Sequence, residues 1–279
     1  MIELKTSDYY KVLAPLQSLN INTLFAKAVI NQLVPGKVYV DNEKEANAFY
    51  IAHPYGMSLL FGEIKNEIFK KDLYNYMINK GDFRNKNEWL QVYPNTWYNV
   101  MKNILGTELV TNDSSDNIDS IPKDTHKKVV ENTRVNFVFD PTKYENKRLN
   151  TLKFEIVKVT KELFNEIQGS VVPKYFWKDE LQFENDGVGY SLIYNGEIAA
   201  TAFSAFRHEN QLELGIETSE KYRGKGLAFE VCSALIDYCL ENNLEPIWAC
   251  RKDNVGSYKL AQKLGFVQTI SIPYYVLAV

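Results

Sequence analysis

The residues best suited to chemistry lie in one stretch, Leu212 to Gly226, which reads Leu-Glu-Leu-Gly-Ile-Glu-Thr-Ser-Glu-Lys-Tyr-Arg-Gly-Lys-Gly. Its first half alternates apolar and polar residues with a period of two, which predicts a strand. A polar turn with two glycines follows, and an apolar helical run begins at Leu227. This order of elements leaves backbone N–H groups unpaired at the positive end of a helix. The stretch therefore predicts an anion site, and a phosphate group fits such a site well.

Strands and helices predicted from hydrophobic periodicity surround this stretch. The clearest is a hairpin at residues 187–206, because its Asn195-Gly196 turn separates two alternating runs. The helix from Leu227 presents one apolar side, and a later helix ends at Gly265. The predicted strands are 154–159, 187–194, 197–206, 212–217, 247–250 and 266–279, and the predicted helices are 161–167, 227–240 and 254–264.

The first half of the chain predicts a smaller α/β arrangement without a catalytic constellation. A helix from Ser7 is expected to be interrupted at Pro15, and Asn66 is expected to begin a helix that Gly81 closes. The polar run 111–128 is expected to be a loop or linker, because it cannot bury enough apolar surface to order. The expected strands of an antiparallel meander with one buried face are 37–40, 48–52 and 57–61.

Length and composition limit the class of protein. A chain of 279 residues suits two domains, and 45% hydrophobic residues support well-formed cores. A net charge of −3 weighs against nucleic acid as a partner. No run approaches the roughly 20 apolar residues that span a bilayer, and no signal peptide is predicted. The three cysteines lack the spacing of a metal knuckle, so buried thiols and no metal are expected. We therefore expect a cytoplasmic protein that acts on neither nucleic acid nor membrane.

Two motifs carry a family resemblance. Arg223-Gly224-Lys225-Gly226-Leu227-Ala228 fits the pattern Arg/Gln-x-x-Gly-x-Gly/Ala and resembles the acetyl-coenzyme A signature of the GNAT N-acetyltransferase superfamily. Asn254-x-x-Ser257, followed by Lys263-Leu264-Gly265-Phe266, resembles the ending of that family's domain. The order of predicted elements over the last 130 residues or so is also that of a GNAT domain. The resemblance implies acetyl-coenzyme A as cosubstrate.

The resemblance also sets the expected fold and its domains. A C-terminal GNAT domain over 150–279 would have a mixed, mostly antiparallel sheet flanked by helices. A smaller, divergent α/β domain over 1–149, a candidate degenerate GNAT domain, would precede it. The chain resembles more narrowly a bacterial subfamily that includes zwittermicin-resistance-type acetyltransferases. The segments that suggest this are Pro35 to Asp41, Pro173 to Trp177 and Glu213 to Thr218.

The resemblance assigns roles by position. The turn would hold the coenzyme's pyrophosphate, and the strand near Ile216, Glu217 and Thr218 would pair with the pantetheine arm. Arg223 and Lys225 would add charge to a pyrophosphate held mainly by backbone N–H groups. Ser257 and Asn254 are candidates for the thiol end, although Asn254 is equally a helix cap. The residues expected to bind the cosubstrate are Ile216, Glu217, Thr218, Arg223, Gly224, Lys225, Gly226, Leu227, Ala228, Asn254 and Ser257.

Four residues are candidates for catalysis. Glu217 is the first choice as base or amine-binding anion, and Glu213 on the same strand face is the second. Both are equally compatible with ordinary polar positions on a half-exposed strand. Many relatives carry an acid tyrosine four residues after the motif serine, but here that position is Ala261. Ser257 and Tyr258, the residue directly after it, complete the four catalytic candidates.

Three functions from different classes are compatible with these features. The first is an N-acetyltransferase that acts on a primary amine of a small molecule, for example an amine-bearing antibiotic. The second is a tandem-GNAT aminoacyl transferase that uses charged tRNA, which the intact turn and the negative charge disfavour. The third is a non-catalytic acyl-coenzyme A sensor, which the missing tyrosine keeps open. A homodimer is a possible assembly.

Overall fold

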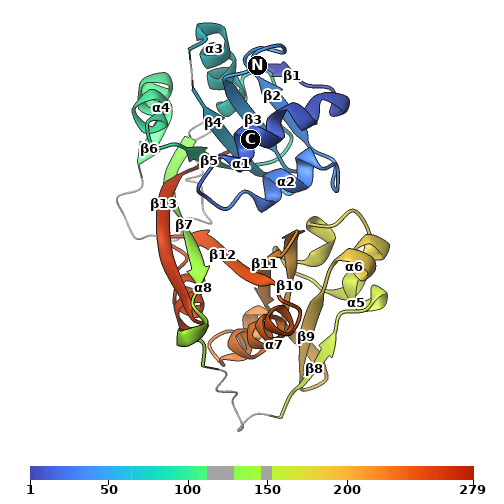
Figure 1. The fold of residues 1–279 in the computed structure, drawn as a ribbon. Coiled ribbons are helices and arrows are strands. Elements are labelled where there is room, and N and C mark those ends of the chain that lie inside the picture. The colour runs from blue at the N-terminus through green and yellow to red at the C-terminus, as the bar shows by residue number, and fades with distance from the viewer. Residues whose placement is uncertain (64, 112–128, 146–152) are drawn as a thin grey trace. The chain divides into compact units, whose positions relative to one another are not determined.

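A computed structural model describes residues 1–63, 65–111, 129–145 and 153–279 (Figure 1). They form a mixed α/β fold in which a large sheet of mixed strand direction is flanked by helices, which confirms the predicted fold class. The predicted linker 111–128 lies, apart from its first residue, outside the described residues. Within the described residues, no helix combines the length and the apolar character needed to cross a membrane.

The chain divides into two compact units, and each unit is made of more than one segment of the sequence. Unit 1 contains residues 1–135, 251–253 and 270–279, and unit 2 contains 136–250 and 254–269. The predicted domain boundary at residues 149/150 follows the order of the chain. The compact units instead follow strand pairing, because the end of the chain belongs to the sheet of unit 1.

Unit 2 contains the predicted anion site. Its strands follow the order β12-β11-β10-β9-β8, in which all neighbours are antiparallel except β11 and β12, which are parallel. The strands are β8 Glu155–Lys158, β9 Gly189–Tyr194, β10 Glu197–His208, β11 Gln211–Thr218 and β12 Glu245–Arg251, and the helices are α5 Lys161–Glu166, α6 Glu180–Asp186, α7 Leu227–Glu241 and α8 Val255–Lys263. The predicted hairpin, glycine turn and last two helices are confirmed, whereas α6 was not predicted.

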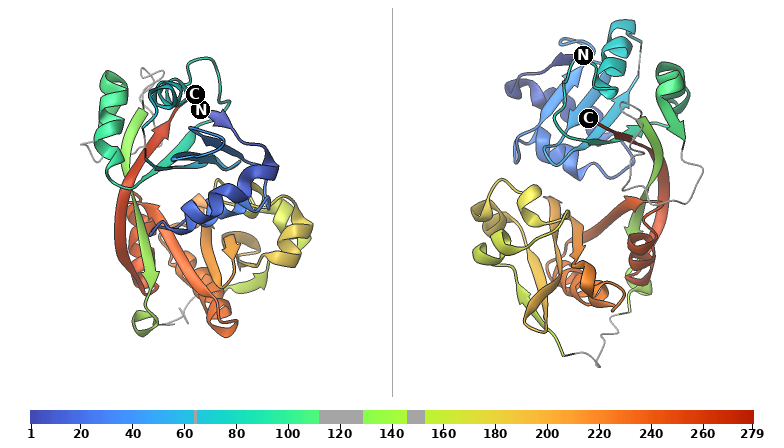
Figure 2. Two further views of the ribbon diagram at one scale, coloured as in Figure 1. Left: turned by 45° about the horizontal axis from the view of Figure 1, so that its top comes forward. Right: turned by 180° about the vertical axis from the view of Figure 1, so that it is seen from behind.

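Helices cover both faces of the sheet in unit 2 (Figure 2). On one face, the ring of Phe176, which follows a short 3₁₀ turn at Pro173–Tyr175, packs edge-on against Phe203 and Phe206 of β10. On the other face, Tyr238 of α7 contacts Tyr190 of β9. Successive side chains of a strand point to opposite faces of the sheet, so each strand contributes side chains to the packing on both faces.

Unit 1 contains the strand order β1-β2-β3-β4-β5-β13 of the same sheet. Neighbouring strands are antiparallel except β4 and β5, which are parallel. The strands are β1 Ile2–Glu3, β2 Lys37–Val40, β3 Ala48–Ala52, β4 Met57–Gly62, β5 Glu88–Tyr93, β6 Leu109–Thr111, β7 Val129–Phe139 and β13 Phe266–Leu277, and the helices are α1 Leu13–Gln17, α2 Leu24–Ile30, α3 Glu67–Met77 and α4 Trp97–Leu105. Strands β7 and β13 contribute residues to both units.

The sequence predictions for unit 1 hold in part. The antiparallel meander is confirmed, but both of its faces are buried, because α3 and α4 pack on one face and α2 on the other.

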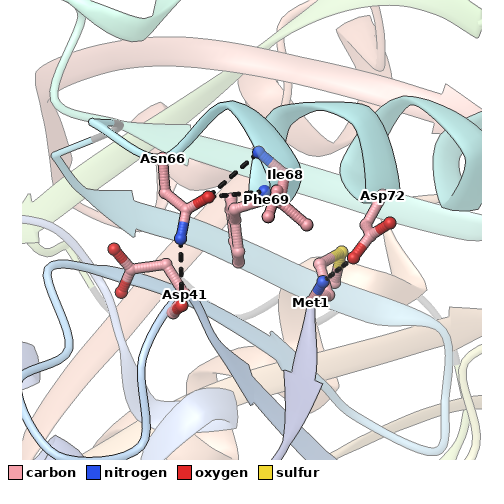
Figure 3. Close-up of polar contacts among 6 residues, drawn as sticks. All are labelled: Met1, Asp41, Asn66, Ile68, Phe69 and Asp72. Carbon is pink, nitrogen blue, oxygen red and sulfur yellow. Dashed lines mark hydrogen bonds and ion pairs between the residues drawn. The ribbon is translucent and has the colours of Figure 1, made fainter.

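The predicted helix limits of unit 1 are correct in part. Pro15 does not interrupt a helix. It lies in the first turn of α1, where a missing N–H removes no intrahelical bond. Asn66 caps α3 as predicted (Figure 3). The helix ends before Gly81, because Asn79 already adopts a left-handed φ of 54°.

The two halves of the chain repeat one order of elements. Each begins with a strand and a helical pair, continues with three antiparallel strands and a helix, and adds a parallel strand and another helix. The last long strand of each half, β7 or β13, then joins the strands of the other half. In the hydrogen-bonded order, β13 is next to β5, whereas β7 is next to β12. Each half thus donates its last strand to the sheet that the other half begins.

Arg84 binds the carbonyl groups that end two elements of unit 1. Its guanidinium donates to Tyr76 O at 3.2 Å and Met77 O at 3.0 Å, at the end of α3. It also donates to Leu277 O and Ala278 O, each at 2.8 Å, at the end of β13. Arg84 is 6% exposed, so these carbonyls have little access to water as an alternative partner.

We expect Arg84→Met to lower the free energy of unfolding by about 3 kcal/mol, because several buried carbonyls lose a charged donor. Urea unfolding followed by circular dichroism measures the change. Lys80→Met, at an exposed position four residues away, is the control and should stay within about 0.5 kcal/mol of the wild type. Equal effects of the two substitutions would contradict the role of Arg84.

Candidate functional site

The turn between β11 and α7 presents backbone N–H groups at a helix end. Gly224 and Gly226 have φ values of 76° and 81°, in the left-handed region that glycine adopts without strain. Among the described residues, no side chain caps α7, whose N-cap position is Gly226 itself. The first N–H in the helix that bonds back is that of Phe229, which donates to Gly226 O at 3.0 Å. The N–H groups of Leu227 and Ala228 therefore precede the helical bonding pattern and face out of the positive end.

The strand that leads into this turn separates from its parallel neighbour. β11 and β12 pair only from Gln211 to Glu213, although β11 continues to Thr218 and β12 to Arg251. On its other side β11 stays paired with β10 as far as Thr218. The described residues thus contain no strand that pairs with the second half of β11 on the β12 side.

The direction of the backbone groups along β11 follows from its ladder. The N–H of Ser219 donates to Ala199 O at 2.9 Å, toward β10. Neighbouring residues of a strand direct their N–H and C=O groups to opposite sides, so Thr218 and Ile216 face away from β10. Arg223 supports this assignment. Its Nε donates to Thr218 O at 3.2 Å, so this carbonyl is bound by a side chain and not by β10. The N–H and C=O groups of Ile216 therefore face the opening between β11 and β12.

Glu217 holds a loop rather than standing alone on its strand. Its Oε2 accepts hydrogen bonds from the N–H and the hydroxyl of Ser170, at 2.8 and 3.1 Å, and from the N–H of Val171 at 2.9 Å. Its Oε1 lies 3.8 Å from the guanidinium of Arg223. The side chain of Glu217 is 13% exposed, and a Cβ on Gly169 would lie 2.5 Å from its Cγ. The carboxylate thus fixes the loop after α5 to the end of β11.

A pocket of about 390 Å³ lies beside this carboxylate, within unit 2. The end of β11, the start of the glycine turn, the first residues of β10 and the loop after α5 form its walls. Glu166, Glu217 and Glu220 contribute carboxylates to the lining, and Arg223 contributes a cation. An amine that carries a positive charge suits such a lining better than an anion does.

The second motif forms a helix cap. The side chain of Asn254 accepts a hydrogen bond from the N–H of Ser257 at 3.1 Å and so begins α8. The hydroxyl of Ser257 accepts from the indole of Trp248 on β12 at 3.2 Å. Asn254 therefore has the role of helix cap that the sequence left open beside coenzyme binding. Ser257 lies against β12, one border of the opening.

Two candidate residues lie apart from the pocket. The hydroxyl of Tyr258 donates to Gln268 of β13 at 2.7 Å, and its ring packs edge-on against Phe137 of β7. Glu213 is 4% exposed, and the ring of Phe203 covers Gly215, the position between the two glutamates on this strand face. The structure therefore brings Glu217, Thr218 and Arg223 together, but it places Glu213 and Tyr258 elsewhere.

The loop that binds Glu217 was not predicted from the sequence. Its signal is a short run, Gln168-Gly169-Ser170, directly after a predicted helix. Gly169 has a φ of 143°, which residues with a side chain rarely adopt. A glycine and a serine after a helix are compatible with an ordinary turn, so the pattern alone did not indicate a carboxylate partner 47 residues away.

We expect Gly169→Ala to lower the free energy of unfolding by about 1 to 3 kcal/mol, because the new methyl group strains the backbone and displaces Glu217. Urea unfolding measures the loss. Gly256→Ala in α8 is the matched control, since the nearest atom to its Cβ is 3.8 Å away. Alanine there should be neutral or should stabilise the helix by up to about 1 kcal/mol. A Gly169→Ala protein as stable as the wild type would exclude the proposed packing.

Comparisons with known proteins agree with the observed fold. The chain is 26% identical over 245 residues to an uncharacterized N-acetyltransferase, YdfB, of Bacillus subtilis, with 87% of this chain and 85% of that protein covered. Its fold is similar to that of a GCN5-related N-acetyltransferase-like protein from Streptococcus suis, with a TM-score of 0.70 and 20% identity over 97% of this chain and 99% of that one. It is also similar to a tandem GNAT protein from the clavulanic acid biosynthesis pathway, with a TM-score of 0.56 and 9% identity over 99% and 97% of the two chains. The model of the GNAT acetyltransferase family matches residues 15–275, and the chain therefore belongs to this family of acetyltransferases.

Proposed function

We propose that the protein transfers the acetyl group of acetyl-coenzyme A to a primary amine of a small molecule. The observation that carries this proposal is a pair of open backbone sites on one segment. The first is the edge of β11 at Ile216, facing the opening between β11 and β12, and the second is the N–H groups of Leu227 and Ala228 after the glycine turn. Pantetheine contains two amides on an extended chain and can add to an open strand edge as a further strand would. The pyrophosphate then reaches the positive end of α7.

The exposed cations at the turn fit the same ligand. Arg223 is 64% exposed in its side chain, and Lys225 is exposed as well. A guanidinium and an ammonium group next to backbone donors strengthen the binding of a diphosphate through charge-assisted hydrogen bonds. The N–H of Ile216 faces the opening in which the thioester would lie. It is suited to donate to the oxygen of the thioester carbonyl as negative charge develops there.

The acceptor enters, in this proposal, from the pocket beside Glu217. Carboxylates of Glu166 and Glu220 attract the ammonium form of an amine, and the proton must leave before attack. Oε2 of Glu217 is held by three donors, so Oε1 is the oxygen that binds the amine or accepts its proton through water. The nitrogen then bonds to the carbonyl carbon, and the C–S bond breaks. The nitrogen releases its proton to water through Oε1 of Glu217, and the sulfur leaves as a thiolate.

In this proposal, neither the position four residues after Ser257 nor Tyr258 supplies a tyrosine acid for this departure. Ala261 is completely buried, and Tyr258 binds Gln268. A free thiol has a pKa of about 8.5, so the thiolate can leave near neutral pH and take its proton from water. The same feature supports a second candidate function, a sensor that binds acetyl-coenzyme A without turnover.

Several finer assignments belong to the proposal. We assign the protein to the zwittermicin-resistance-type subfamily, to the cytoplasm, and to amines rather than to nucleic acids or membranes as partners. A homodimer is compatible with these assignments. Each of these assignments rests on the sequence features given above. A screen of amines as acetyl acceptors would identify the substrate.

We expect Gly224→Val to weaken the binding of coenzyme A at least tenfold, because a side chain at a φ of 76° moves the amides of the turn. Isothermal titration calorimetry with coenzyme A measures the affinity. Gly196→Val is the matched control, since Gly196 has a φ of 78° in the β9–β10 turn and, like Gly224, has no atom within 4 Å of an added Cβ. Equal affinity of the two variants would remove the support for the turn as the phosphate site.

Turnover with amines should release free coenzyme A in steady state. A thiol reagent can measure this release on the native protein, because all three cysteines are buried and burial raises the pKa of Cys239 to about 12. We expect release with small cationic amines and none with the matching alcohols. Tight binding of acetyl-coenzyme A without release by any amine would favour the sensor over the enzyme.

A further inference from the structure

The repeated order of elements allows the two halves to be compared residue by residue at the coenzyme site. Gly62 at the end of β4 and Thr218 at the end of β11 each pair with an alanine of the preceding strand. The next residues, Glu63 and Ser219, each donate their N–H to the residue before that alanine, at 2.7 and 2.9 Å. This common register makes Gly62 the equivalent of Thr218 and therefore sets the equivalence of every residue along the two strands.

The strand edge that is open in the second half is closed in the first. Leu60 is the equivalent of Ile216, and it pairs with Val92 of β5. The parallel pairing of β4 with β5 covers all residues from Met57 to Phe61, whereas that of β11 with β12 stops at Glu213. In the first half, β5 thus occupies the edge to which a pantetheine chain would bind.

The helix end that is open in the second half is also closed in the first. The side-chain oxygen of Asn66 accepts hydrogen bonds from the N–H groups of Ile68 and Phe69, at 2.9 and 3.2 Å (Figure 3). Its amide nitrogen donates to Asp41 O at 3.2 Å, which fixes the orientation of the side chain. The Asn66 oxygen therefore takes the N–H groups of α3 that a phosphate would bind, a position that Gly226 leaves open before α7.

The connection between the strand and the following helix also differs between the two halves, and it is shorter in the first. Residues 63–66 connect β4 to α3, whereas residues 219–226 connect β11 to α7. The first connection has four residues and no glycine, whereas the second has eight residues that include Gly224 and Gly226. In addition, the carbonyl of Gly62 accepts a hydrogen bond from the indole of Trp97 at 2.8 Å. The equivalent carbonyl, that of Thr218, accepts only from the exposed, flexible side chain of Arg223 among the described contacts.

We propose that the first half is a closed copy of the coenzyme site, and that each chain binds one acyl-coenzyme A, through its second half alone. Three independent features close the first site: the full pairing of β4 with β5, the short connection, and Asn66 in the place of a phosphate. The proposal rests on the proposed function, because it takes the second half as the open site. It assigns the first half to supporting the sheet that accepts β13 rather than to a second round of the same chemistry.

Calorimetry on the full chain tests the number of sites. Titration with coenzyme A should give one site per chain, Gly226→Val should remove all measurable uptake, and Asn66→Asp should leave the affinity within twofold of the wild type. Two sites per chain, or uptake that survives Gly226→Val and is lost in Asn66→Asp, would overturn the proposal. No uptake by the wild type would overturn the proposed function itself, and with it the assignment of an open site to the second half.

Hydrogen–deuterium exchange with and without coenzyme A locates the site independently of stoichiometry. We expect the ligand to slow exchange at least tenfold in peptides that cover 214–230 and to leave peptides that cover 57–63 and 66–77 unchanged. Slowed exchange in the first-half peptides alone would place the ligand on the closed copy and refute the inference. Slowed exchange in both sets with two calorimetric sites would refute it as well.

Discussion

The pairing of parallel strands is the constraint on which the site depends. A strand in the middle of a sheet has its N–H and C=O groups bound on both sides, and nothing remains for a ligand. β11 is paired on both sides only at its beginning, and its second half keeps β10 alone. Its remaining edge can bind an extended amide chain, and the next residues lead directly to a helix end. Separation of two strands thus converts a structural element into a binding surface.

The carboxylate of Glu217 shows how one residue can connect structure with chemistry. Three donors from residues 170 and 171 bind one of its oxygens, so the loop after α5 and the end of β11 form one wall of the pocket. A carboxylate held in this way has a fixed position relative to the strand edge at Ile216. In the proposed reaction, this fixed carboxylate would orient the amine next to the thioester, and such orientation is a large part of the advantage of an enzyme over solution.

Much of unit 2 could be predicted from the sequence, because its signals are local. Alternation predicted β11, Asn195-Gly196 predicted the hairpin, and the glycines predicted the turn before α7. The partner of Glu217 could not be predicted, because Ser170 is distant in sequence and belongs to a turn of ordinary composition. The meander of unit 1 was predicted with one buried face. The second face is buried by helices, and the alternation of residues within the strands does not predict where those helices pack.

The relation between the halves was also beyond a reading of local patterns. Local sequence patterns predict elements one at a time, and the repeat appears only when strand neighbours are compared. The exchange of β7 and β13 depends on pairing between segments far apart in the chain. For the same reason, a boundary drawn along the sequence and the compact units do not coincide.

The exchanged strands have a consequence for the order in which this chain can mature on the ribosome. β5 is complete once residue 93 has been synthesised, but its neighbour β13 begins only at residue 266. Domains commonly fold as units, N-terminal first, during synthesis. Here the earlier half emerges with an unfilled sheet edge beside β5 and must keep it until translation has passed the whole of the later half. A first half that folds before β13 has been made therefore has an unpaired edge at β5, and an unpaired strand edge is a place where another chain can add a strand.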